Sequence, residues 1–266
     1  MKRLLLVVGP ILSIAGAVGL IMFGDALVGI MDGVLTYRFV NPPEPLPASL
    51  VSVKWAAFSG MALTLGLAIS CIGTVIRDSQ KTISLAGRLL ASVAGILLVF
   101  GTMSLLWGVL GAKRAFIIIA TSAMTPKPEN VQEMVEASSP MFMTGSAILL
   151  IGAAVLLVAG QVGLQAKPPQ AIETHSVFGV LAAIGSVLLG VVLSLLFIGI
   201  LLHGNALESF FIHTAIIPKA SELARHLVGI LNKSLLAFIG VGCQGTMHIL
   251  AAAFAPSAKQ DAASND

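Results

Sequence analysis

The chain has 266 residues, of which 57% are hydrophobic and 10% are charged, and its mean hydropathy is +0.99. Soluble domains carry about 25% charged residues, so this composition excludes a water-soluble fold for most of the chain. The net charge of +3 comes without a basic cluster, which argues against a nucleic-acid partner. We therefore expect an integral membrane protein whose main surroundings are the lipid bilayer.

Long apolar runs predict the membrane-spanning helices. A helix needs about 20 apolar residues to cross roughly 30 Å of hydrocarbon. In chain order, the runs of at least this length are Leu4–Ile30, Trp55–Ile76, Leu89–Ala112, Met141–Leu164, Val177–Leu202 and Leu235–Phe254. We expect an all-α, multi-pass membrane protein with about six transmembrane helices.

The first run follows Lys2 and Arg3, as the apolar core of a signal peptide follows its basic start. This run is nearly twice as long as such a core, and no small-residue cleavage site with a polar mature start follows it. We therefore expect the run to remain in the protein as its first membrane helix.

Six helices would place both termini on the same side of the membrane. Seven of the 15 lysines and arginines would lie on that side and eight on the other, so their number does not decide the orientation. Lys2 and Arg3 directly flank the first helix, which often dominates orientation, and most acids lie on the opposite side. We expect a cell (inner) membrane protein with cytoplasmic termini and with residues 32–50, 120–138 and 205–232 outside.

The runs fall into three successive hairpins, with a period of about 85 residues. Their boundaries are 1–83, 84–170 and 171–254, and a polar C-terminal tail follows at 255–266. Each hairpin has a proline-containing stretch between its two apolar runs, at 41–47, 125–131 and 217–223.

Alignment of the first two hairpins supports the interpretation as tandem repeats. With Pro43 on Pro128, Glu44 falls on Glu129 and Gly60 on Gly145 without a gap. Proline ends an incoming helix and favours the start of a new one. Apolar residues at helical spacing then predict short interfacial helices at 131–135 and 223–227.

Three segments of the second hairpin are similar to motifs of a known family. Its residues 108–112 are Gly-Val-Leu-Gly-Ala, its residues 125–137 form a proline-bearing loop, and residues 143–153 begin Met-Thr-Gly-Ser-Ala. This arrangement resembles the channel-forming helix pair of the MotA/TolQ/ExbB proton-channel family. The first hairpin is similar at 27–31 (Leu-Val-Gly-Ile-Met), and the third at 199–203 (Gly-Ile-Leu-Leu-His).

The resemblance implies a pore lined by hydroxyl side chains on both helices of each pair. The matching positions are Ala26 and Ser59, Ala112 and Thr144, and His203 and Leu236, so only one member of each pair is polar. The family's large cytoplasmic helical domain is also missing, since residues 77–88 and 165–176 are short linkers.

Two functions stay open at this point. The first is a proton-channel or energy-coupling subunit of a transport or motor complex driven by an ion-motive force. The alternative is a non-conducting scaffold or assembly subunit that binds partner proteins through its helices and proline-containing loops. Both imply a homo- or hetero-oligomer with other membrane proteins.

Polar residues within the apolar runs are the candidates for an ion path: Asp25, Ser59, Thr144 and His203. A carboxylate in a spanning segment is costly and suggests function, but Asp25 has the alternative of an interfacial site beside Arg38 or Lys54. His203 is either a protonatable switch or a histidine at headgroup level.

Other residues within the apolar runs are better interpreted as contributing to helix packing than to an ion path. The ring of His248 is placed to donate a hydrogen bond to Gln244, one helical turn back. Small residues let helices approach closely, which makes Gly60, Gly145 and Gly240 the predicted contact positions. Cys71 and Cys243 lie inside apolar runs and are expected to be small core residues.

The sequence does not support an enzyme, a cofactor or a metal site. The five histidines are scattered, with no acid or cysteine at ligand spacing. Nucleotide-binding loops, nucleophile elbows and zinc-protease motifs are not found in the sequence. We therefore expect no enzymatic activity and no cofactor.

Overall fold

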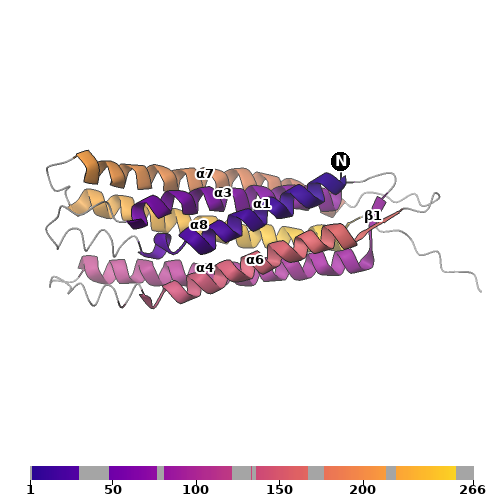
Figure 1. Cartoon of the computed structure of the whole chain (residues 1–266), viewed down its shortest axis with the longest axis horizontal. Coiled ribbons are helices and arrows are strands. Elements are labelled where there is room, and N and C mark those ends of the chain that lie inside the picture. Colours follow the sequence, from indigo (N-terminus) through magenta and orange to yellow (C-terminus); the bar gives the residue numbers. More distant parts are fainter. Residues whose placement is uncertain are drawn as a thin grey trace, which may run out of the picture.

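The computed structural model describes residues 2–29, 48–76, 81–121, 133, 136–166, 177–213 and 220–255. Within these ranges the chain forms a bundle of long helices that run along a common axis (Figure 1). Six of these helices are long and apolar enough to cross a membrane. The expectation of an all-α, multi-pass membrane protein is therefore confirmed.

The spanning helices are longer than the apolar runs at several ends. Their bounds are α1 (Lys2–Phe23), α3 (Ala48–Val75), α4 (Leu85–Thr121), α6 (Ser139–Val162), α7 (Val177–His213) and α8 (Ala220–Ala253). Polar residues end a hydrophobic run, but the backbone hydrogen bonds of a helix continue past them. Helices α4, α7 and α8 therefore carry polar turns beyond their predicted limits.

Two local expectations need correction. The segment 223–227 belongs to the first turns of α8 and is not a separate interfacial helix. The first run ends as a continuous helix at Phe23, because Gly24 and Asp25 form a turn before a short helical segment at 26–29. The other predicted interfacial segment, 131–135, lies outside the described residues except for Glu133.

The helices form a closed ring. Within each hairpin α1 contacts α3, α4 contacts α6 and α7 contacts α8, and between hairpins α3 contacts α7, α8 contacts α4 and α6 contacts α1. Every junction between hairpins thus joins the second helix of one to the first helix of another. Repeated hairpins around one axis would give this order, but α1 has 22 residues whereas α4 and α7 have 37 each, so the repeat stays a prediction.

We call the two ends of the bundle the terminal end, where α1 begins and α8 ends, and the loop end opposite (Figure 1). At the terminal end, β1 (Lys81–Ile83) pairs antiparallel with β2 (Leu164–Ala166). The Ser84 amide extends this pair by donating to the Gly163 carbonyl at 2.6 Å. No pattern in the sequence predicts this short ribbon, which joins the linkers on either side of the second hairpin.

Small residues bring the helices of the first and second hairpins close together. A Cβ at Gly16 of α1 would clash with the Leu63 amide nitrogen of α3. Pro10 has no N–H, so the carbonyl of Leu6, one turn earlier, loses its helical donor. Gly160 of α6 approaches that carbonyl so closely that a Cβ there would lie 2.6 Å from its oxygen.

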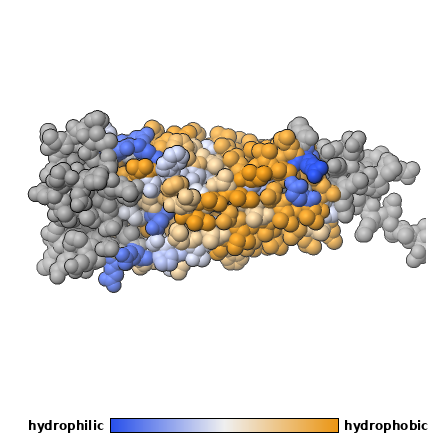
Figure 2. Space-filling model, in the orientation of Figure 1, coloured by the Kyte–Doolittle hydropathy of each residue, from blue (hydrophilic) through white to orange (hydrophobic). Residues whose placement is uncertain are grey.

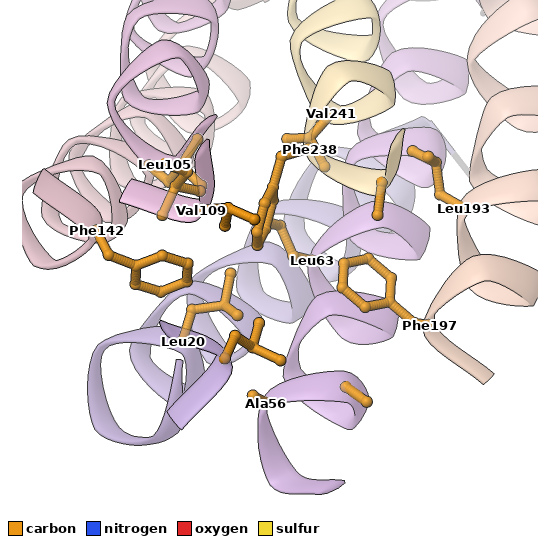
Figure 3. Close-up of a cluster of buried hydrophobic side chains, with 14 of the residues drawn as sticks. Leu20, Ala56, Leu63, Leu105, Val109, Phe142, Leu193, Phe197, Phe238 and Val241 are labelled. Carbon is orange, nitrogen blue, oxygen red and sulfur yellow. The ribbon is translucent and has the colours of Figure 1, made fainter. Parts of the chain in front are cut away.

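Three fully buried phenylalanines, which we call the aromatic layer, fill the middle of the bundle. They are Phe142 on α6, Phe197 on α7 and Phe238 on α8. The ring of Phe238 meets the other two edge-on, with centroids 5.7 Å from Phe142 and 6.2 Å from Phe197. Figure 3 shows these rings packed among leucine and valine side chains of the surrounding helices.

The outer surface has the polarity expected of a membrane protein. A broad apolar band lies between more hydrophilic ends (Figure 2). Trp55 and Trp107 are more than half exposed, and tryptophans of this kind favour the membrane interface.

The two cysteines differ in their burial. Cys71 is buried as expected, but Cys243 is exposed, so its interpretation as a core residue was wrong.

Candidate functional site

Two histidines and a lysine form a hydrogen-bonded group between α7 and α8, which we call the triad. Nδ1 of His203 lies 3.0 Å from Nδ1 of His226, and Nζ of Lys233 lies 2.9 Å from Nε2 of His203. All three side chains are partly buried and belong to helices that span the membrane. Ionisable side chains in such helices are costly and indicate function.

The hydrogen bonds assign the protons of the triad. A lysine ammonium donates and cannot accept, so Nε2 of His203 accepts from Lys233 and the ring proton of His203 lies on Nδ1. That proton is donated to Nδ1 of His226, whose own proton must then lie on Nε2. With Lys233 charged, both rings are neutral, and a further proton on either accepting nitrogen breaks one of the two hydrogen bonds.

Glycines on both helices make room for the triad. A Cβ at Gly229 would lie 2.6 Å from Nε2 of His203, and a Cβ at Gly199 would lie 2.6 Å from Cε of Lys233. Spacings of three, four and seven residues place groups on one face of a helix. His226, Gly229 and Lys233 therefore share the face of α8 that meets α7.

Charged groups surround the triad toward the loop end. Lys54 of α3 forms an ion pair with Glu208 of α7, and each side chain is 24% exposed. Glu222 lies one turn before His226 and is partly buried, and Arg225 beside it is exposed. The ammonium of Lys54 is thus paired with Glu208, and Arg38 lies outside the described residues, so the interfacial site predicted for Asp25 beside one of these cations stays a prediction.

The four predicted ion-path residues lie in separate surroundings. Asp25 is exposed and accepts a hydrogen bond from Ser139 Oγ at 2.5 Å. Ser59 donates to the Trp55 carbonyl at 2.7 Å, within its own helix. Thr144 is exposed on α6, while His203 alone belongs to the triad. Whether any of them carries ions stays a prediction.

The three predicted packing glycines each face a neighbouring helix. A Cβ at Gly60 would clash with the ring of Phe197, and one at Gly240 would clash with the side chain of Leu193, both on α7. A Cβ at Gly145 would lie 2.6 Å from the carbonyl oxygen of Gly101 on α4. Gly60 therefore packs against a helix of another hairpin, whereas Gly145, with which it aligns in the sequence, packs against the other helix of its own hairpin.

Two members of the triad are not among the site residues predicted from the sequence. His226 falls in the segment 205–232 predicted to lie outside, and Lys233 falls just before the last apolar run at Leu235, but both lie within α8. Their spacing of seven residues, which returns to the same helix face, is the signal that was available. The expectation for His248 is confirmed, because its Nδ1 lies 2.9 Å from the Gln244 carbonyl oxygen.

The described part of the chain contains no group of three histidine, cysteine or acidic side chains placed to hold a metal ion. Comparisons with protein-family models, with curated proteins and with solved structures found no match in any of the three.

Proposed function

We propose that this multi-pass membrane protein is a proton-responsive subunit of an energy-coupling complex for transport or motor work. The observation that carries the proposal is the triad, in which two imidazoles and an ammonium are linked within membrane-spanning helices. Histidine is the side chain whose charge changes near neutral pH. Protonation of the triad breaks a hydrogen bond between α7 and α8 and adds a positive charge beside Lys233.

The aromatic layer indicates that coupling, rather than free conduction, is the role of this chain. Phe238 lies about 7.5 Å beyond Lys233 along α8, at 1.5 Å per residue. All three rings of the layer are fully buried and in edge-on contact through Phe238. A dry apolar constriction blocks ions, so protons reach the triad from the loop end and leave by the same side unless the layer opens.

The scaffold function remains the second candidate, and the close helix contacts favour it. Gly16 and Gly145 are packed so tightly that a side chain there would clash with the backbone of a neighbouring helix, and one at Gly60 would clash with the ring of Phe197. A rigid, filled bundle of this kind suits a protein that holds partners without moving. The two candidates differ in whether acidification changes the contact between α7 and α8.

Distance measurements between spin labels on α7 and α8 test this difference. Labels are placed at Asn205→Cys and Asn232→Cys, both exposed positions, with Cys243→Ser removing the exposed native thiol. Between about pH 8 and about pH 5, where histidine titrates, the distance distribution should shift in the protein with an intact triad. The same chain with His203→Gln and His226→Gln should show no shift.

An exposed charge provides the matched control. Arg114→Gln removes an exposed charge from α4, a helix that contributes no member of the triad, and should leave the shift unchanged. A distribution that does not respond to pH in the intact triad would support the scaffold. A response that persists without both histidines would show that other groups sense the proton.

A further inference from the structure

A second polar site is enclosed in the terminal half of the bundle, around His248 and Gln244 of α8. His248 is 1% exposed and Gln244 is fully buried. The carbonyl of Gln244 accepts the hydrogen bond from His248, so the ring proton of His248 lies on Nδ1. Its Nε2 then carries no proton and can only accept a hydrogen bond, and it has no hydrogen-bond partner among the described residues.

The side-chain amide of Gln244 has a fixed orientation. Its Nε2 donates to two backbone carbonyls, those of Thr64 on α3 and Ser186 on α7, both at 3.1 Å. Carbonyl oxygens only accept, so the amide cannot be turned over without losing both bonds. Oε1 of Gln244 is therefore a second buried acceptor, again without a partner among the described residues.

Two bare acceptors on one helix face require a donor. Positions 244 and 248 are one turn apart on α8, so the side chains lie on the same face. Buried acceptors that no donor satisfies destabilise a fold. Ser70 and Ser234 also have buried hydroxyls without partners among the described residues, but a hydroxyl can donate or accept and so does not define the polarity of a site.

We propose that this site binds water, enclosed where α3, α7 and α8 meet and donating to Nε2 of His248 and Oε1 of Gln244. Water is small, carries two donors and commonly satisfies buried polar groups in this way. A metal ion is a poorer occupant, because His248 belongs to no group of three ligating side chains in the described chain. The proposal holds whether or not the triad responds to protons.

Solid-state NMR of the full chain in lipid bilayers tests the proposal. With ¹⁵N-labelled histidine, His248 should show a proton on Nδ1 and none on Nε2. A cross peak from water to its ring should appear at short mixing times, at which the fully buried side chain of Leu98 shows none. The signal is assigned by its loss in His248→Gln or, if that variant does not fold, by substituting the other four histidines.

Either of two results would overturn the proposal. A dry ring, to which magnetisation from water passes no faster than to Leu98, would exclude bound water. A proton on Nε2 with a bare Nδ1 would contradict the assigned hydrogen bond to Gln244. Gln244→Met gives a second measurement, because loss of the amide should weaken the water cross peak of His248 severalfold while His203 keeps its own.

Discussion

Phe197 and Phe238 meet edge to face across the α7–α8 contact, with their ring centroids 6.2 Å apart and their planes at 69°. This pair separates two polar regions that lie along the same helix. Lys233 of the triad precedes Phe238 on α8, and the buried Gln244 follows it. Gly60 of α3 lies directly against the ring of Phe197, so three helices fix the position of the layer.

The first prediction concerns Gly60. In Gly60→Ala the new methyl group clashes with the buried ring of Phe197, and overpacking of this kind costs roughly 1–3 kcal/mol. The melting temperature in detergent should therefore fall. Gly29→Ala is the control, because a Cβ there meets no atom within 4 Å and alanine favours a helix. If both variants melt alike, the contact with Phe197 is not tight.

The second prediction concerns the space around the triad. In Gly229→Ala the methyl group occupies the position next to Nε2 of His203, which displaces the ring from Lys233. The pH response of the α7–α8 distance should be lost. Gly204→Ala, one residue from His203, should retain it, since its nearest neighbour is Cγ1 of Val53 at an ordinary 3.4 Å. A normal pH response in Gly229→Ala would show that the response does not depend on the hydrogen bond between His203 and Lys233.

The third prediction concerns the end of α8. The guanidinium of Arg88 donates to the carbonyls of Ala252, at 2.9 Å, and of Ala253, where a helix leaves acceptors unpaired. Arg88→Met should reduce the free energy of unfolding by about 1 kcal/mol, because these bonds and the interaction with the helix dipole are lost. Denaturation in detergent measures the change, and Arg88→Lys should lose less. No change in Arg88→Met would show that water replaces the guanidinium.

The spanning helices could be predicted from the sequence, but the faces they bury could not. In a soluble protein the polar side of a helix marks its surface, whereas lipid and protein interior are both apolar. Phe58 and Phe238 look alike in the sequence, yet one is 48% exposed and the other is fully buried. For the same reason the exposure of Thr144 and Cys243 could not be foreseen.

Contacts between helices of different hairpins could not be predicted from the sequence either. Lys54 and Glu208 are 154 positions apart, and their pairing depends on the order of helices in the ring. That order places α3 next to α7, whereas the hairpin pattern predicts only neighbours within each hairpin. His203 could be singled out as polar in an apolar run, but its partners required the register between α7 and α8.

The last prediction decides whether the aromatic layer closes the bundle to protons. Phe238→Ala removes a fully buried ring and should cost about 3–5 kcal/mol of stability. It should also let water join the two polar regions, so proteoliposomes should show a proton leak that the unsubstituted chain lacks. Phe58→Ala removes an exposed ring of α3 and should leave the vesicles tight.

Three further substitutions complete this experiment. Asp25→Asn and Thr144→Ala should leave the leak of Phe238→Ala unchanged, because Asp25 pairs with Ser139 and Thr144 is exposed on the outer surface of α6. In contrast, adding His203→Gln should reduce the leak, since the triad supplies the protonatable groups on the loop-end side. A leak already present in the unsubstituted chain would show that protons pass the closed layer, and a tight Phe238→Ala would show that the layer is not the barrier.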